Sequence, residues 1–457
     1  MRPVYALRDA KTLDSFLISK YSLSSSRLID KAGALSAAIV EKENENASIL
    51  VLLGPGNNGA DGLALSEILS HSHIVSLYFY SDKSNDEVKE RKAKLNKAIK
   101  VIDTLDGIRS YDVVIDALFG FSFHGEIDPY VINALKSAKK VYALDVPSGF
   151  AYNAYKTITF TTPKKEFYFD YRAQTGLIDV ANPDFPEEEL IASPENIYLL
   201  EDSDLKARPM SLTSYKNIRG HVAFIGGSSF YPGAALLGAK ALIKGGSGLV
   251  TIYSDESTKS FVINNENSII NGRDQDLSRY DALLVGAGWG NGDEVLFKKA
   301  IDSALPIVID ADGLKQLNRS IKLSNAIITP HMGEFKRLLN SYEIKTATLE
   351  EDIKELSRKS GAVVVLKTSV VYISDGDVIY LYDGENPALG VGGSGDILGG
   401  IIASSLGRGA SPLDAAINGV IIHQKAGREL RDRVGFFTAT ELLEEVGRVC
   451  FKSIFSL

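Results

Sequence analysis

The chain has 457 residues, of which 45% are hydrophobic and 24% are charged, as is typical of globular domains. Its net charge of −8 argues against a protein that binds nucleic acid by broad phosphate neutralisation, and its single cysteine, Cys450, excludes an internal disulfide and a cysteine-rich zinc site. No apolar stretch is long enough for a membrane span, and the N-terminal segment lacks the apolar core of a secretory signal. We therefore expect a cytoplasmic protein with roughly two to four domains that binds neither nucleic acid nor a membrane.

The N-terminal part alternates short apolar strands with helices. After a helical stretch at residues 12–41, strands are expected at residues 48–53, 74–80, 113–116 and 141–145, and helices at residues 63–69, 87–100 and 129–137. Short apolar strands separated by helices indicate a mainly parallel sheet that is covered on both faces. The pattern predicts a Rossmann-like doubly wound α/β domain.

Polar residues follow three of these strands. The segment GPGNNGADG, residues 54–62, comes directly after the first strand, and its glycines allow the backbone to approach a phosphate at a helix N-terminus. Asp116 and Asp145 end two other strands, and the carboxyl ends of parallel strands meet in one crevice. Asn58, Asp116 and Ser148 can offer an all-oxygen set with a single carboxylate, which suits a large, weakly charged cation better than zinc or copper.

Together, GPGNNGADG, DALFGFSFHG and LDVPSG resemble the YjeF-N family of epimerases for hydrated nicotinamide dinucleotides. The resemblance covers about residues 1–200 and implies a potassium ion on Asn58, Asp116 and Ser148. It also implies substrate contacts at Asn57, Asn58, Gly59, Ala60, Asp61, Gly120, Phe121, Ser122, Phe123, His124, Gly125, Glu126 and Asp145. Ala60 replaces a glycine of the family motif, and the run around Lys164 departs from the family pattern, which leaves the role of this lysine open.

A proline-rich and acidic stretch between residues 181 and 210 separates this part from the rest of the chain. We expect a domain junction there, with domains at residues 1–203 and 204–457. A second α/β pattern follows, with strands at residues 222–225, 249–253, 282–285, 307–310, 326–329 and 363–366, a hairpin at residues 370–382, and helices at residues 394–406, 412–428 and 438–449.

The segment Gly392-Gly-Ser-Gly395 leads directly into the first of these helices. The free amides and the dipole of a helix N-terminus form a site for anions. Asp396 lies in the first turn beside those amides, where a carboxylate can act as the general base for a hydroxyl that attacks a phosphoryl group. No Gly-Lys-Ser/Thr follows, so the segment is not a Walker loop.

GGSGD before an apolar helix resembles the ribokinase-like superfamily, and four further ordered segments narrow the resemblance. These segments, HVAFIGGSSFYPGAA, VGAGWG, VIDADG and ITPHMGE, are similar to the YjeF-C family of ADP- or ATP-dependent dehydratases that repair NADHX and NADPHX. The match covers about residues 210–457 and implies substrate contacts at Ala234, Gly288, His331 and Asp396. It implies nucleotide contacts at Lys367, Thr368, Ser369, Val370, Val371 and Gly395. Val371 stands where the family has a threonine, so no hydroxyl contact is expected there.

The two resemblances together imply repair of hydrated nicotinamide dinucleotides in one chain. Phosphorylation of the hydroxyl beside the ring nitrogen turns it into a good leaving group, so a kinase-type site with Asp396 as base and magnesium on the nucleotide phosphates can perform a net dehydration of the S epimer. Asp145 is then the candidate acid–base group of an epimerase that supplies this epimer. Two alternatives stay open: a ribokinase-like small-molecule kinase fused to a ligand-binding module, and an N-terminal domain that binds without turnover. We expect a homo-oligomer; the sequence leaves open whether ADP or ATP is the donor, and whether NADHX or NADPHX is preferred.

Overall fold

The computed structural model describes the whole chain except residues 124, 191, 207–208, 274–275 and 456–457. It divides into two compact units, Arg2–Ile197 and Tyr198–Leu457, and Met1 is assigned to the second unit. The division lies a few residues before the junction expected at residues 203–204. Asp202 belongs to the C-terminal unit, since its carboxylate accepts hydrogen bonds from the Tyr382 hydroxyl and the Arg428 guanidinium, both at 2.6 Å.

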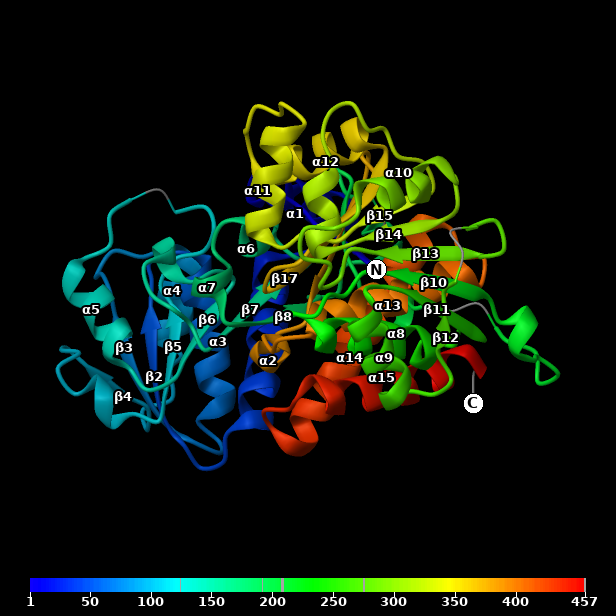
Figure 1. Ribbon diagram of the computed structural model, residues 1–457. Coiled ribbons are helices and arrows are strands. Elements are labelled where there is room, and N and C mark those ends of the chain that lie inside the picture. The colour runs from blue at the N-terminus through cyan, green and yellow to red at the C-terminus, as the bar shows by residue number, and fades with distance from the viewer. Residues whose placement is uncertain (124, 191, 207–208, 274–275, 456–457) are drawn as a thin grey trace. The chain divides into compact units, whose positions relative to one another are not determined.

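The N-terminal unit is built on a parallel seven-stranded sheet in the order β4-β3-β2-β5-β6-β7-β8 (Figure 1). Its strands are β1 (Arg2–Pro3), which lies outside this sheet, β2 (Ser48–Leu53), β3 (Ile74–Phe79), β4 (Lys100–Ile102), β5 (Val113–Ala117), β6 (Val141–Leu144), β7 (Lys156–Phe160) and β8 (Leu177–Ala181). Its helices are α1 (Leu7–Tyr21), α2 (Ser25–Glu43), α3 (Asn57–Leu69), α4 (Asp86–Ala93), α5 (Pro129–Ser137), α6 (Lys165–Phe169) and α7 (Arg172–Thr175). The predicted doubly wound sheet is confirmed.

The strand order reverses between β2 and β5, and this reversal positions the N-terminal site. From β2 the chain moves outward through β3 and β4, and then returns to the other side of β2 at β5. Doubly wound sheets bind ligands at such a switch point, beyond the carboxyl ends of the strands. Gly54, Asp116 and Asp145 all lie at these ends, as the sequence predicted.

Three expectations about this unit were wrong. Helix α3 begins at Asn57, so the asparagines and glycines expected in a loop form the first turns of a helix. Helix α4 ends at Ala93; residues 94–99 of the expected helix form turns and loop, and Lys100 begins edge strand β4. Strands β7 and β8 were not predicted: β7 alternates polar and apolar residues, and the residues of β8 are mostly half-buried at the other edge of the sheet, so neither carries a continuous apolar run.

The C-terminal unit contains a second sheet with the strand order β9-β18-β17-β16-β15-β14-β13-β10-β11-β12. The strands are β9 (Ile197–Leu199), β10 (His221–Ile225), β11 (Leu249–Tyr253), β12 (Ile270–Asn271), β13 (Ala282–Val285), β14 (Ile307–Ile309), β15 (Ala326–Ile328), β16 (Ala362–Leu366), β17 (Val370–Ser374) and β18 (Ile379–Asp383). The helices are α8 (Pro232–Lys244), α9 (Glu256–Asn265), α10 (Glu294–Asp302), α11 (Met332–Ser341), α12 (Leu349–Ser360), α13 (Ser394–Gly407), α14 (Pro412–Val434) and α15 (Ala439–Phe455). Strands β17 and β18 form the predicted antiparallel hairpin.

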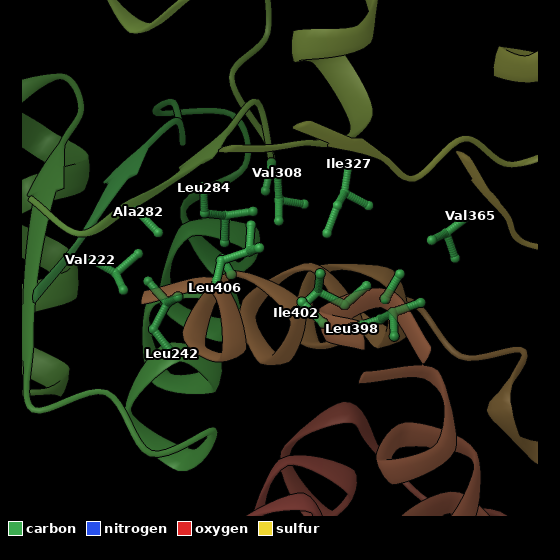
Figure 2. Packing of buried hydrophobic residues seen from close by; sticks show 14 of the residues in the cluster. Val222, Leu242, Ala282, Leu284, Val308, Ile327, Val365, Leu398, Ile402 and Leu406 are labelled. Atoms are coloured by element: carbon green, nitrogen blue, oxygen red, sulfur yellow. The ribbon is translucent and has the colours of Figure 1, made fainter. Parts of the chain in front are cut away.

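Helix α13 packs lengthwise against this sheet. Leu398, Ile402 and Leu406 recur every four residues, are almost fully buried, and face the side chains of β10, β13, β14, β15 and β16 (Figure 2). Complete burial of such a side chain contributes about 1.5–3 kcal/mol. The three contacts therefore fix the helix axis, and with it the position of its N-terminus. No helix in the described part of the chain is both long and apolar enough to cross a membrane.

Candidate active sites

A cavity of about 600 Å³ lies in the N-terminal unit, and eight predicted substrate residues line it. They are Asn57, Asn58, Asp61, Gly120, Phe121, Ser122, Phe123 and Asp145. Among the described residues, Gly59, Ala60, Gly125 and Glu126 do not line it, and His124 lies outside the described residues. The volume is in the range of small-molecule sites.

Two glycines next to the cavity allow the backbone to close over the switch point. A Cβ on Gly54 would lie 1.6 Å from the Leu118 carbonyl oxygen, and a Cβ on Gly59 would lie 2.0 Å from the Gly54 carbonyl oxygen. Both positions exclude any side chain. Gly59 therefore shapes the site through the backbone and does not line the cavity.

Asp145 lies at the wall of this cavity in a strained backbone conformation. Its φ of +66° is in the left-handed region, which non-glycine residues adopt rarely and mostly at functional sites. One carboxylate oxygen, Oδ2, accepts a hydrogen bond of 3.1 Å from the Phe121 amide, and a Cβ on Gly120 would lie only 2.7 Å from that oxygen. Burial raises the pKa of Asp145, while Lys164 and the Phe121 amide lower it.

The structure indicates a charge-balancing role for Lys164, whose function the sequence left open. Its side chain is buried, and its ammonium donates to the carbonyl oxygens of Phe160 at 2.6 Å and Thr162 at 2.8 Å. Burial lowers the pKa of Lys164, whereas Asp145 and Asp14 are the largest influences that raise it. The cavity carboxylates Asp145 and Asp14 thus favour the charged form of a buried lysine whose ammonium is held by two backbone carbonyls.

The oxygens of Asn58, Asp116 and Ser148 have different surroundings. The Asp116 carboxylate is fully buried and accepts hydrogen bonds from the Leu118 amide, the Ser148 amide and hydroxyl, and the Tyr152 hydroxyl, at 2.5–3.0 Å. The Asn58 side chain is also buried, yet neither atom of its amide has a hydrogen-bond partner among the described residues. A buried, unpaired amide oxygen is a ligand that an oxygen-seeking cation could use.

The C-terminal site is centred on the N-terminus of helix α13. Gly393, in left-handed conformation with φ +93°, precedes the helix, and a Cβ there would lie 2.4 Å from a Leu237 methyl group. The Ser394 amide donates to the Val391 carbonyl oxygen at 3.2 Å, so this amide of the predicted anion site already has a partner. The amides of Gly395 and Asp396, the next two residues of the helix, remain the donors available to an anion.

Asp396 lies in that turn within a group of charged side chains. Lys367 donates to Asp310 Oδ1 at 2.7 Å, and a Cβ on Gly395 would lie 3.3 Å from the Lys367 ammonium. Thr329 donates to the same Asp310 oxygen at 2.7 Å. The pKa of Asp396 is raised to about 7, chiefly by burial and also by the charges of Asp310 and Asp312, while Lys367 lowers it. A carboxylate with a pKa near neutrality is suited to proton transfer at physiological pH.

The remaining predicted residues lie around this group. The backbone of His331 forms an isolated parallel β-bridge with that of Lys367. Its side chain caps α11, because Nδ1 accepts hydrogen bonds from the amides of Gly333 at 2.9 Å and Glu334 at 3.3 Å. The imidazole is exposed, and its Nε2 lies 3.5 Å from Glu334 Oε1, so a ligand would reach this nitrogen beside the Glu334 carboxylate. A Cβ on Gly288 would lie 2.8 Å from the Ala234 Cβ, so these two predicted substrate residues touch.

The predicted nucleotide segment can offer mainly its backbone. Val370 and Val371 are buried in β17, and the Thr368 hydroxyl donates to the Val370 carbonyl oxygen at 2.5 Å. The valine side chains therefore belong to the core and not to a nucleotide site. Lys367 and Gly395 are the residues of this set that lie beside Asp396.

Sequence reasoning missed three side chains. Asp310 follows an apolar strand, the same signal that identified Asp116 and Asp145, so the pattern could have found it. His423 is buried on α14 with its Nε2 3.1 Å from both the hydroxyl and the carbonyl oxygen of Ser394, and burial lowers the pKa of His423 to about 4. It supports the turn before Asp396 as a neutral imidazole. Asp14 lines the N-terminal cavity from α1, far from any motif.

The two units define the chain as a two-domain α/β enzyme with a Rossmann-like and a ribokinase-like part. Residues 222–448 match a family model described as NAD(P)H-hydrate dehydratase, and residues 22–165 match one described as YjeF-related protein N-terminus. A ribokinase-like superfamily protein of Enterococcus faecalis V583 has the fold of the C-terminal part, with a TM-score of 0.52, 22% identity, and coverage of 58% of this chain and 99% of that chain.

Relatives match over nearly the full length. The bifunctional NAD(P)H-hydrate repair enzyme Nnr of Coxiella burnetii is 30% identical over 95% of this chain and 96% of its own length. The enzyme of the same description in Hyperthermus butylicus is 29% identical over 97% of this chain and 93% of its own length. The chain belongs to the family of bifunctional NAD(P)H-hydrate repair enzymes. The predicted family, fold class and pair of activities, epimerase and ADP- or ATP-dependent dehydratase, are confirmed, and a small-molecule kinase is not favoured.

Proposed function

We propose that the chain repairs NADHX and NADPHX at two separate sites, with Asp396 as the base of dehydration and Asp145 as an acid–base group of epimerisation. The observation that supports this best is the surroundings of Asp396: a carboxylate with a pKa raised to about 7, at a helix N-terminus, beside the Lys367–Asp310 pair.

In the dehydration, Asp396 removes the proton from the hydroxyl next to the ring nitrogen. The hydroxyl oxygen then attacks the terminal phosphorus of ADP or ATP, and the amides of the first turn of α13 together with Lys367 stabilise the charge on the transferring oxygens. The ring nitrogen's lone pair subsequently expels phosphate, which leaves the reduced nicotinamide ring. His331, Ala234 and Gly288 bind the substrate beside this base.

Magnesium fits the chemistry of this site. The ion prefers oxygen ligands and usually binds one or two carboxylates together with substrate phosphates. Asp310 and Asp312 lie close enough to Asp396 to raise its pKa, and one or both of these carboxylates would hold the magnesium ion. When bound, it neutralises charge on the nucleotide phosphates.

In the epimerase, the substrate occupies the N-terminal cavity with its reactive carbon near Asp145. Asn58, Asp116 and Ser148 would hold a potassium ion, for which the unpaired amide oxygen of Asn58 is the open ligand. When bound, the ion supplies a positive charge at the switch point, where a dinucleotide's phosphates meet the N-terminus of α3. Location in the cytoplasm and assembly into a homo-oligomer stay predictions of the sequence.

The test is incubation of mixed R- and S-NADHX with ADP or ATP, followed by the near-ultraviolet absorbance of the reduced ring and by product analysis. We expect complete recovery of NADH, with one free phosphate released for each molecule repaired. A kinase would instead release a phosphorylated acceptor without recovery of the absorbance, and that result would exclude the proposed chemistry.

A further inference from the structure

The N-terminal cavity contains a second carboxylate that neither the motifs nor the proposed mechanism uses. Asp14 lies on helix α1 and lines the cavity together with Asp145, which follows strand β6. Its Oδ1 atom is buried and has no hydrogen-bond partner among the residues that the structure describes. A buried carboxylate oxygen without a partner destabilises the fold, so its position in a cavity wall is explained if a ligand supplies the missing partner.

The pKa values of Asp14 and Asp145 are influenced by different neighbouring groups. The pKa of Asp14 is raised to about 6, chiefly by burial and also by the charge of Asp145, while Lys164 and the Thr161 hydroxyl lower it. Asp145 has in addition the hydrogen bond from the Phe121 amide, which favours its ionised form. The Phe121 amide thus distinguishes the two carboxyl groups, since it donates to Asp145 while Oδ1 of Asp14 stays without a partner among the described residues.

The other charged groups near the cavity do not provide this pair. Burial and then Asp145 raise the pKa of Asp61, which lies on α3, well above its ordinary value, while Arg91 on α4 lowers it. This raised pKa makes Asp61 less suited than Asp145 to the role of a base. Lys11 lies on the same helix as Asp14 and also lines the cavity. Glu166, on α6, raises the pKa of Lys164.

We propose that Asp14 is a catalytic residue of the epimerase, the second acid–base group, which acts on the face of the nicotinamide ring opposite to Asp145. The proposal rests on the proposed function of this domain. It explains why Asp14 joins Asp145 in the cavity wall from a different element, when a single group could serve only one face of a planar intermediate.

The step balances with water as the only further reactant. Protonated Asp14 gives its proton to the hydroxyl on the carbon next to the ring nitrogen, the carbon–oxygen bond breaks, and water leaves while the nitrogen lone pair forms a carbon–nitrogen double bond. Water then adds to the other face, a new carbon–oxygen bond forms, and the Asp145 carboxylate takes the proton that this water loses. Reversal exchanges the two roles, and proton exchange with solvent restores the starting state.

The test measures epimerisation of purified R- or S-NADHX by the full-length enzyme in ¹⁸O-labelled water, with spontaneous epimerisation subtracted. Each catalysed inversion should incorporate one ¹⁸O atom, because the original carbon–oxygen bond breaks. Asp14→Asn should slow inversion on the order of 10²–10⁴-fold and leave nucleotide-dependent dehydration of S-NADHX unchanged. When Asp14 is the acid, it must be protonated, so the wild-type rate of inversion in that direction should fall as pH rises above about 6. The Asp14→Asn variant should not show this decrease.

Asp9→Asn is the matched control, since Asp9 lies on the same helix, pairs with Arg8 and does not line the cavity. It should keep the wild-type rate. If Asp14→Asn fails to fold, as its thermal midpoint would show, the smaller Asp14→Ser variant replaces it. An Asp14→Asn or Asp14→Ser rate within threefold of wild type, or inversion without ¹⁸O incorporation, overturns the proposal.

The same experiment separates this proposal from the proposed function. A wild-type chain that does not catalyse inversion overturns both. A normal rate in Asp14→Asn beside a slow rate in Asp145→Asn overturns only the assignment of Asp14.

Discussion

The Asp396→Asn variant should lose dehydration and at the same time gain stability at alkaline pH. The loss follows because asparagine cannot accept the proton of the attacking hydroxyl, and removal of a general base typically slows a reaction on the order of 10²–10⁴-fold. The gain follows because the folded protein holds this carboxylate in surroundings that disfavour its charge: burial raises the pKa of Asp396 from 3.8 to about 7.

The magnitude follows from that difference. A tenfold change in a protonation equilibrium corresponds to about 1.4 kcal/mol, so full ionisation of Asp396 destabilises the folded state by up to about 4 kcal/mol. The pKa of Asp396 is higher in the folded state than in the unfolded state. Ionisation of Asp396 therefore takes nothing from the free energy of unfolding below about pH 4 and lowers it progressively as pH rises towards 7. Asparagine carries no charge, so the variant should be more stable than wild type by about 2–4 kcal/mol at pH 8, and the difference should vanish near pH 4.

Two assays check this prediction. Dehydration of S-NADHX is measured with ADP or ATP, and the free energy of unfolding of the C-terminal unit is measured in denaturant at pH 5 and pH 8. Asp414→Asn is the control: Asp414 is also a first-turn acid, at the exposed start of α14, and its loss should leave dehydration unchanged. Near-normal dehydration by Asp396→Asn, or a variant less stable than wild type at pH 8, would refute the reasoning.

Three further predictions concern the epimerase unit and the domain division. Asp145→Asn should slow catalysed inversion of R-NADHX at least about 10²-fold while dehydration of S-NADHX keeps its rate; a loss only in proportion to unfolding would make Asp145 a structural residue. Gly54→Ala should destabilise the N-terminal unit by about 3 kcal/mol or more, because its Cβ would lie 1.6 Å from a carbonyl oxygen, whereas Gly56→Ala, with nothing within 4 Å, should cost only about 0.5–1 kcal/mol, as alanine does at a helix N-cap. A chain divided between Ile197 and Tyr198 should give two soluble pieces, the first with epimerase and the second with dehydratase activity; pieces that are inactive apart would contradict this division.

Apolar strands and helix-start signals made most of the fold predictable. The boundaries of β11 and β13 and of helix α5 agree with the expected ones, because fully buried strands read as continuous apolar runs and Pro129 marks the start of its helix. Edge strands β4 and β8 lack that pattern, since solvent replaces the sheet on one side. Glycines at positions 54, 56, 59 and 62 suggested a loop, whereas close packing requires three of them, Gly54 just before helix α3 and Gly59 and Gly62 inside it.

The sites were predictable only where a side chain follows a strand or belongs to a motif. Asp145 and Asp396 meet these conditions, and the structure brings each into a charged, buried environment. Asp14 and His423 reach their sites from the middle of helices, where tertiary packing decides which residue faces the cavity or the turn. No local pattern carries that information.

The most direct test of the two-site account is one time course of mixed R- and S-NADHX with ADP or ATP, run with wild type, Asp145→Asn and Asp396→Asn. The account predicts that wild type restores the reduced ring's absorbance completely. It predicts that Asp145→Asn restores only the S fraction in the fast phase, and that Asp396→Asn restores almost none while still interconverting R and S. Complete and equally fast recovery by either variant, or a phosphorylated product in place of NADH, would contradict it.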